Sequence, residues 1–256
     1  MLDRHKSAVG RAVDGVKAPI RGADFLLRHP TLMRYAMAPF LLSFIILSFF
    51  LWISVSYLVL PFHDKLVTWL HLAGWLKLVL EVILWPAAIL LYLILASFGF
   101  VAIANLLAGP FNERLSLRTE ELHTGKAESE VMGLREALKQ FGRSLAMEAK
   151  KIAFFLLIQL LLLSIWVVPV VGWMAHAVLA GLVTVWFLAT EYLDYPMERR
   201  KMGYRSRLLF AWSHRYEIFG FGAGIGIWLM IPVLGFTALP VSVVGGTLLY
   251  LRITES

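Results

Sequence analysis

Long stretches without a charged side chain alternate along this chain with short blocks that hold almost all of its Lys, Arg, Asp and Glu residues. The uncharged stretches are 35–60, 82–112, 152–190 and 218–251. Each is longer than the roughly 20 apolar residues that an α-helix needs to cross a bilayer. Since 59% of all residues are hydrophobic and 16% are charged, the pattern predicts an all-α integral membrane protein.

The third and fourth stretches carry the same break near their middle. Val167–Trp173 and Met230–Phe236 align without a gap, 63 residues apart, and each contains Pro-x-x-Gly at the same positions. A repeat of this kind fixes architecture more firmly than a local pattern does. Because proline and glycine interrupt helices, we predict two helical hairpins, 152–190 and 218–251.

The depth of these hairpins in the bilayer depends on the length of their arms. The arms have about 17, 18, 14 and 16 residues, or about 21–27 Å at the rise of an α-helix, against about 30 Å of hydrocarbon. We favour re-entrant hairpins, and short spans are the alternative. The fold prediction is therefore two long transmembrane helices plus two Pro/Gly-broken hairpins, re-entrant or short-spanning.

The basic residues set the expected orientation. Lys and Arg number 7, 2, 8, 6 and 1 in the successive charged segments, and large counts belong on the cytoplasmic side. We expect a cytoplasmic N-terminus and a single membrane domain, 1–256. Its parts are a basic amphipathic segment (1–34), two spanning helices (35–112), cytoplasmic helices (113–151), hairpin 1 (152–190), a basic cytoplasmic segment (191–217) and hairpin 2 (218–251).

Three local features refine this picture. Ala18–Arg34 predicts an amphipathic helix at the membrane surface, broken at Pro30. The second spanning helix is expected to stop or kink near Gly109 and Pro110, and the charged block that follows is expected to form two helices joined around Gly125. The alternate glycines predict close helix packing, since neither a Gly-x-Gly-x-x-Gly spacing nor a Walker lysine accompanies them: Gly220, Gly222, Gly224 and Gly226.

Composition argues against several classes of function. The chain has no cysteine, so thiolate chemistry and disulfides are excluded. Its seven histidines show no metal-binding spacing, and we expect no metal and no cofactor. The net charge of +7 is interpreted as cytoplasmic loops of a membrane protein, not as a nucleic-acid surface. No arrangement of side chains resembles a catalytic site, so an enzyme is not expected.

The block between the second spanning helix and Gly125 resembles a known family, the CysZ-like proteins with the etoposide-induced-2.4 domain. The matching positions are Asn105, Ala108, Pro110, Phe111, Asn112, Leu115, Glu120, Thr124 and Gly125. Glu191–Met197 is similar to the family's Tyr-x-Asp-Tyr-Pro signature, and Met230–Phe236 with Leu239–Thr247 to its C-terminal hairpin. The resemblance covers about Pro30 to Leu251.

This resemblance implies two long spanning helices and two pairs of partly penetrating helices. It also implies sulfate uptake for cysteine biosynthesis, in homo-oligomers of the bacterial inner membrane. The family's sulfate motif, Pro-Gly-Leu-Arg-Arg, aligns with Pro30–Arg34, where Leu32 and Arg34 match while Thr31 and Met33 depart.

Two places offer an anion site. At the start of the first span, unpaired backbone N–H groups and Arg34 can hold an anion, with Thr31 and Leu32 beside it. The alternatives are that Arg34 only extends to the interface and that Thr31 is the N-cap. At the hairpin tips, helices starting near Gly172 and Gly235 can point positive ends at a substrate, or the Pro-x-x-Gly sequences only make the turns.

Polar side chains within the apolar stretches mark a pathway or form interhelical hydrogen bonds: Asn105, Asn112, Gln159 and His176. Glu191 and Asp194, close in sequence to Arg199–Lys201, predict a local ion-pair network. The leading hypothesis is a permease or channel-like transporter for a small oxyanion, most often sulfate in this family. The alternative is a non-transporting membrane scaffold or envelope-assembly protein of the same fold.

Overall fold

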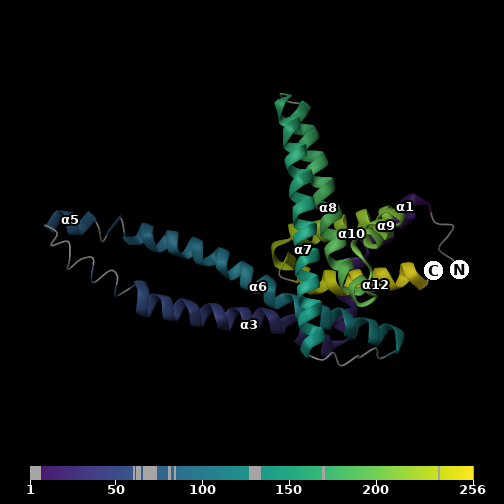
Figure 1. Cartoon of the computed structure of the whole chain (residues 1–256), viewed down its shortest axis with the longest axis horizontal. Coiled ribbons are helices and arrows are strands. Elements are labelled where there is room, and N and C mark those ends of the chain that lie inside the picture. Colours follow the sequence, from purple (N-terminus) through teal and green to yellow (C-terminus); the bar gives the residue numbers. More distant parts are fainter. Residues whose placement is uncertain are drawn as a thin grey trace. The chain divides into compact units, whose positions relative to one another are not determined.

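The computed structural model describes residues 7–59, 61, 65, 74–79, 82–83, 85–126, 134–168, 171–235 and 237–255, and all its regular elements are helical. Two compact units form, Met1–Leu32 with Glu113–Ser256, and Met33–Asn112. The longer elements, all but α2 labelled in Figure 1, are α1 (Ala8–Val16), α2 (Ala18–Arg28), α3 (Pro30–Ser54), α5 (Gly74–Val79), α6 (Trp85–Thr124), α7 (Leu134–Leu163), α8 (Val171–Arg199), α9 (Tyr204–Ser213), α10 (Arg215–Met230) and α12 (Ala238–Glu255). Shorter pieces are η1 (Val55–Val59), η3 (Ser164–Val167) and α11 (Pro232–Gly235).

Among the residues that the structure describes, three helices are long and apolar enough to cross a membrane. They cover Pro30–Tyr57, Ala149–Val167 and Val171–Arg199, and little of their apolar surface is buried inside the protein. Large apolar side chains such as Phe44, Leu160 and Met174 are more than half exposed. This much apolar surface requires an apolar surrounding. The prediction of an all-α membrane protein is therefore confirmed.

The first hairpin is longer than its sequence pattern suggests. Helix α7 continues from the charged block into the apolar arm without a break, and α8 has 29 residues. The two helices pack side by side up to the tip (Figure 1). Both arms thus reach spanning length. The second hairpin is shorter, with 16 residues in α10.

The second spanning helix does not stop near Gly109 and Pro110, and the alternative, a kink there, stays a prediction. Helix α6 passes through Pro110 and ends at Thr124, so it does not stop at Gly109. Proline in a helix interior costs about 3 kcal/mol. Packing of the following turns offsets this cost, because Leu115 and Thr119 are fully buried.

The predicted break at Pro30 is confirmed, and the first spanning helix starts there, earlier than the uncharged stretch that begins at residue 35. Helix α2 ends at Arg28, and Pro30 begins α3, where a missing N–H and a fixed φ favour proline. Pro39 lies at the tenth residue of this helix. The expected end of the polar helix before Gly125 is confirmed: α6 ends at Thr124, and Gly125 has a φ of 69°.

The two hairpin tips repeat each other in backbone geometry. Val168 has φ −91° and ψ 110°, and its counterpart Ile231 has φ −94° and ψ 108°. Each precedes a proline, which disfavours the helical region for the residue before it. Pro169 itself lies outside the described residues. The amides of Gly172 and Gly235 donate to the carbonyls of Val168 and Ile231, at 3.0 and 2.8 Å.

The two tip glycines nevertheless have different roles. A Cβ on Gly172 would lie 2.1 Å from the Ile165 carbonyl oxygen, so the turn requires glycine there. A Cβ on Gly235 would meet its nearest neighbour at 3.7 Å, an ordinary contact. Helix α8 starts at Val171, as predicted for the first tip. At the second tip the prediction was wrong, because the one-turn α11 intervenes and α12 starts at Ala238.

The N-terminal helices pack against the second hairpin, α1 on α10 and α2 on α12. A Cβ on Gly220 would lie 2.0 Å from the Ala12 carbonyl oxygen, and one on Gly224 would lie 2.6 Å from that of Val16. Close packing is thus confirmed for both. Gly226 has open space, so the prediction was wrong there. The N-terminal segment is therefore part of the packed core on one side, while Ile20 and Leu27 are exposed on the other.

Candidate functional site

The start of α3 holds the residues expected to bind an anion. Leu32 is 1% exposed and anchors this turn, whereas Thr31 and Arg34 are exposed. The Arg34 guanidinium lies over the Tyr35 ring, 5.4 Å from its centroid. Because α3 begins at Pro30, Thr31 lies in the first turn and is not the residue that precedes the helix.

The polar residues of the first hairpin bond from one arm to the other. His176 Nδ1 lies 3.1 Å from the Leu162 carbonyl oxygen, and its ring contacts Trp166 edge-on. Gln159 donates to Thr184 Oγ1 at 3.5 Å. These contacts are what interhelical hydrogen bonding requires.

The remaining candidates are spread over other elements. Asn112 is buried within α6. The side chain of Asn105 lies outside the described residues. Gly172 and His176 are one turn apart in α8, and Gly235 ends α11. The predicted residues thus belong to several elements. The charged networks of the described residues are formed by other side chains.

An arginine network, defined as Ser116, Glu120, Arg199, Arg200 and Thr247, joins the end of α6 to α8 and α12. The Glu120 carboxylate bridges both guanidinium groups, with Oε2 on Arg199 and Oε1 2.7 Å from Arg200 Nη2. Arg199 Nη1 donates to Ser116 Oγ at 3.0 Å, and Ser116 Oγ lies 2.6 Å from Thr247 Oγ1. One polar network therefore fastens three helices together.

The direction of these hydrogen bonds can be assigned. Thr247 donates its hydroxyl proton to the Val243 carbonyl at 2.8 Å, so it can only accept from Ser116. Ser116 in turn accepts from Arg199. The hydroxyl groups of Ser116 and Thr247 therefore each donate one hydrogen bond and accept one.

The backbone at the end of α8 holds both arginines at this place. Lys201 has a φ of 54°, and the Met202 amide donates to the Met197 carbonyl at 3.1 Å. This left-handed closure ends the helix directly after Arg199 and Arg200. The Arg200 guanidinium lies 4.8 Å from the centroid of the Tyr250 ring on α12.

Electrostatics of the network follow from this geometry. Burial alone would raise the pKa of Glu120, but hydrogen bonds and charge from Arg199 and Arg200 outweigh it and lower that pKa. For Glu113, about two helical turns earlier in α6, burial and the charge of Glu198 raise the pKa. The carboxylate between the two arginines is thus the one whose charged form the protein stabilises.

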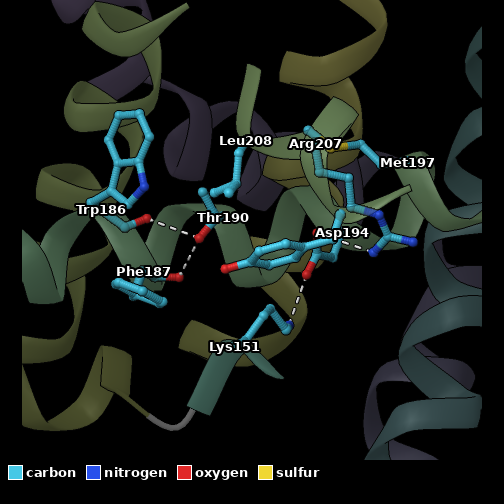
Figure 2. Close-up of a pocket in the computed structure, with 9 residues that line it drawn as sticks. Lys151, Trp186, Phe187, Thr190, Asp194, Met197, Arg207 and Leu208 are labelled. Carbon is cyan, nitrogen blue, oxygen red and sulfur yellow. Dashed lines mark hydrogen bonds and ion pairs between the residues drawn. The ribbon is translucent and has the colours of Figure 1, made fainter. Parts of the chain in front are cut away.

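A second network, the lysine network, consists of Lys151, Glu191, Asp194 and Arg207. Figure 2 shows Asp194 between Lys151 of α7 and Arg207 of α9. Lys151 Nζ lies 2.7 Å from Asp194 Oδ2 and 2.8 Å from Glu191 Oε2. Arg207 Nη1 lies 3.2 Å from Asp194 Oδ1, and its Nε donates to the Met202 carbonyl.

A small cavity of about 30 Å³ adjoins this network, lined also by Trp186, Phe187 and Thr190 (Figure 2). Thr190 bonds to carbonyls of its own helix. A space of this size holds one or two water molecules. The lysine network therefore stabilises the packing of α7, α8 and α9.

The predicted ion-pair network exists, but its cationic partners were predicted wrongly. Asp194 pairs with Lys151 and Arg207, and Arg199 pairs with Glu120. Residues five positions apart on a helix point about 140° away from each other, so Asp194 and Arg199 face different neighbours. The spacing of Asp194 and Arg199 along the helix could therefore have predicted that they belong to different networks. The partners Glu120 and Lys151, 40 or more residues away, had no local signal.

Comparison with known proteins supplies a family. Residues 18–240 match the family model described as Sulfate transporter CysZ/Etoposide-induced protein 2.4. The chain is similar to the sulfate transporter CysZ of Pseudomonas aeruginosa (strain LESB58), with 30% identity over 89% of this chain and 90% of the relative. It is also similar to that of Pseudomonas fluorescens (strain Pf0-1), 34% identical over 71% and 72% of the two chains. The Salmonella paratyphi A protein of the same name is 28% identical over 88% and 87%.

Proposed function

Because the chain belongs to the sulfate transporter CysZ/etoposide-induced protein 2.4 family, we propose that it transports sulfate across the bacterial inner membrane. The observation that carries the proposal is the match along about nine-tenths of both chains to relatives named as sulfate transporters. The three helices of spanning length in the described part of the chain agree with a role in the membrane.

The proposed arrangement is a single membrane domain with a cytoplasmic N-terminus. In it, 35–112 forms two spans and the two hairpins enter from the cytoplasmic side. The count of Lys and Arg in successive loops supports this orientation. The protein works as a homo-oligomer with a channel-like path, and it supplies sulfate for sulfur assimilation and cysteine synthesis.

Within this proposal, Arg34 is the residue that first holds the anion. Its exposed guanidinium stands near the start of α3, where the helix dipole is positive. Leu32 fixes the turn by burial, and Thr31 contributes a hydroxyl beside it. The glycine tip at Gly172 and the polar His176, Asn105 and Asn112 belong to the proposed path.

Binding of labelled sulfate by the purified protein tests this function, because a transporter must bind its substrate. Arg34→Ala should remove the saturable binding that the start of α3 contributes. Arg28→Ala is the matched control, since it removes an exposed arginine two residues before α3 that pairs with Asp24 at 2.9 Å. Equal, unsaturable retention by all three folded proteins would contradict sulfate transport and favour the scaffold function, which the departures at Thr31 and Met33 favour.

A further inference from the structure

Both arginines of the arginine network are fixed by a second contact besides the carboxylate that they share. Arg199 uses Nη1 for Ser116 Oγ at 3.0 Å and Nη2 for Glu120. Arg200 uses Nη1 for the Pro196 carbonyl at 3.1 Å and Nη2 for Glu120 at 2.7 Å. The hydroxyl and the carbonyl therefore hold the guanidinium groups in place even when the carboxylate is absent.

The groups that bind the Glu120 carboxylate are those expected of an oxyanion-binding site. Two guanidinium groups each direct one N–H donor at a separate oxygen of one anion. Planar guanidinium forks are the side chains that match carboxylates, phosphates and sulfates in this way. A tetrahedral oxyanion can place two oxygens as the carboxylate does, and its second charge would balance the second arginine.

The network can also be reached from outside. The Arg200 side chain is 36% exposed, whereas those of Arg199 and Glu120 are 14% and 12% exposed. An anion would therefore meet Arg200 first and Arg199 only after Glu120 moves aside. Displacing one anion by another is an exchange of similar interactions, so binding stays weak enough for release, as transport requires.

We propose that Arg199 and Arg200 form a second sulfate-binding site, which the Glu120 carboxylate occupies as an internal competitor. This inference rests on the proposed function, because sulfate is the anion that the family's relatives are named for. It adds a site on α8, outside the start of α3, and a carboxylate that sets its affinity.

Glu120→Gln tests the competitor directly. The amide keeps the size of the side chain but removes its charge, which leaves two positioned guanidinium groups without an anion. We expect the purified full-length variant to bind labelled sulfate about tenfold more tightly than the wild type. Glu121→Gln is the matched control, because Glu121 is the next residue and pairs with Arg118, so its removal should leave sulfate affinity unchanged.

The gain must depend on the arginines. Adding Arg200→Gln to Glu120→Gln should return sulfate affinity to the wild-type value. An unchanged affinity in folded Glu120→Gln protein, or a gain that survives Arg200→Gln, would overturn the inference. If Glu120→Gln does not yield folded protein, Glu120→Asp keeps the charge but shortens its reach. It should then show a smaller gain, and no gain would equally overturn the inference.

Two further experiments are needed. One distinguishes sulfate from a lipid headgroup as the bound anion, and the other distinguishes this inference from the proposed function. Labelled sulfate bound to Glu120→Gln is challenged with unlabelled sulfate and with vesicles of anionic phospholipid. If only the vesicles displace it, the site belongs to a lipid headgroup and the sulfate site is overturned. Uptake of sulfate by wild-type protein in liposomes reports the proposed function alone. The difference in affinity between Glu120→Gln and the double variant reports this inference alone.

Discussion

Asp194→Asn should destabilise the protein strongly, because Asp194 neutralises two buried cations. Its carboxylate lies 2.7 Å from Lys151 Nζ and 3.2 Å from Arg207 Nη1, and the three side chains are 12%, 10% and 9% exposed. Removing one partner of a buried ion pair costs about 3–5 kcal/mol, since a charge remains buried without compensation.

The expected cost lies toward the lower end of that range. Lys151 keeps Glu191 at 2.8 Å, and Arg207 keeps the Met202 carbonyl at 3.0 Å. The amide also retains an acceptor oxygen. A loss of about 3 kcal/mol corresponds to a fall in Tm of about 6–12 °C for a chain of this size.

Thermal unfolding in detergent, followed by tryptophan fluorescence, measures this effect. Asp24→Asn is the control, because it removes the same charge from an exposed pair with Arg28, 57% and 73% exposed, and should cost less than about 1 kcal/mol. Equal falls in Tm for the two variants would refute the view that the lysine network stabilises the packing of α7, α8 and α9.

Gly220→Ala should destabilise the protein by about 1–3 kcal/mol, because its Cβ would lie 2.0 Å from the Ala12 carbonyl oxygen. Gly226→Ala, with open space around it, should be neutral or slightly stabilising in the same unfolding assay. The pKa of Glu120 lies below its ordinary value of 4.5, so its ion pairs stabilise the fold above that pH and this contribution is lost as the pH falls through the lower folded-state pKa. The Tm difference between wild type and Glu120→Gln should therefore shrink below about pH 4.5; a constant difference would contradict this linkage.

The hairpin tips show how much of the fold a local pattern can predict. Pro-x-x-Gly fixed the turn in both, because proline restricts the residue before it wherever it occurs. Val168 and Ile231 have nearly the same dihedral angles as a result. The pattern did not predict the start of α12 at Ala238, because Gly235 is not closely packed and the chain has room for an extra turn.

Pro110 and the two ion-pair networks show where such patterns fail. Proline usually ends or kinks a helix, but α6 continues through Pro110. The burial of Leu115 and Thr119 outweighs the lost hydrogen bond. Charged residues adjacent in sequence suggested pairs within one helix. The actual partners, Glu120 for Arg199 and Lys151 for Asp194, are brought together only by the packing of separate helices.

The most direct test of sulfate transport is uptake of labelled sulfate into liposomes that contain the purified, folded protein. The account predicts saturable uptake that excess unlabelled sulfate suppresses and that Arg34→Ala abolishes. Uptake no faster than in protein-free liposomes would contradict the proposal that this chain transports sulfate.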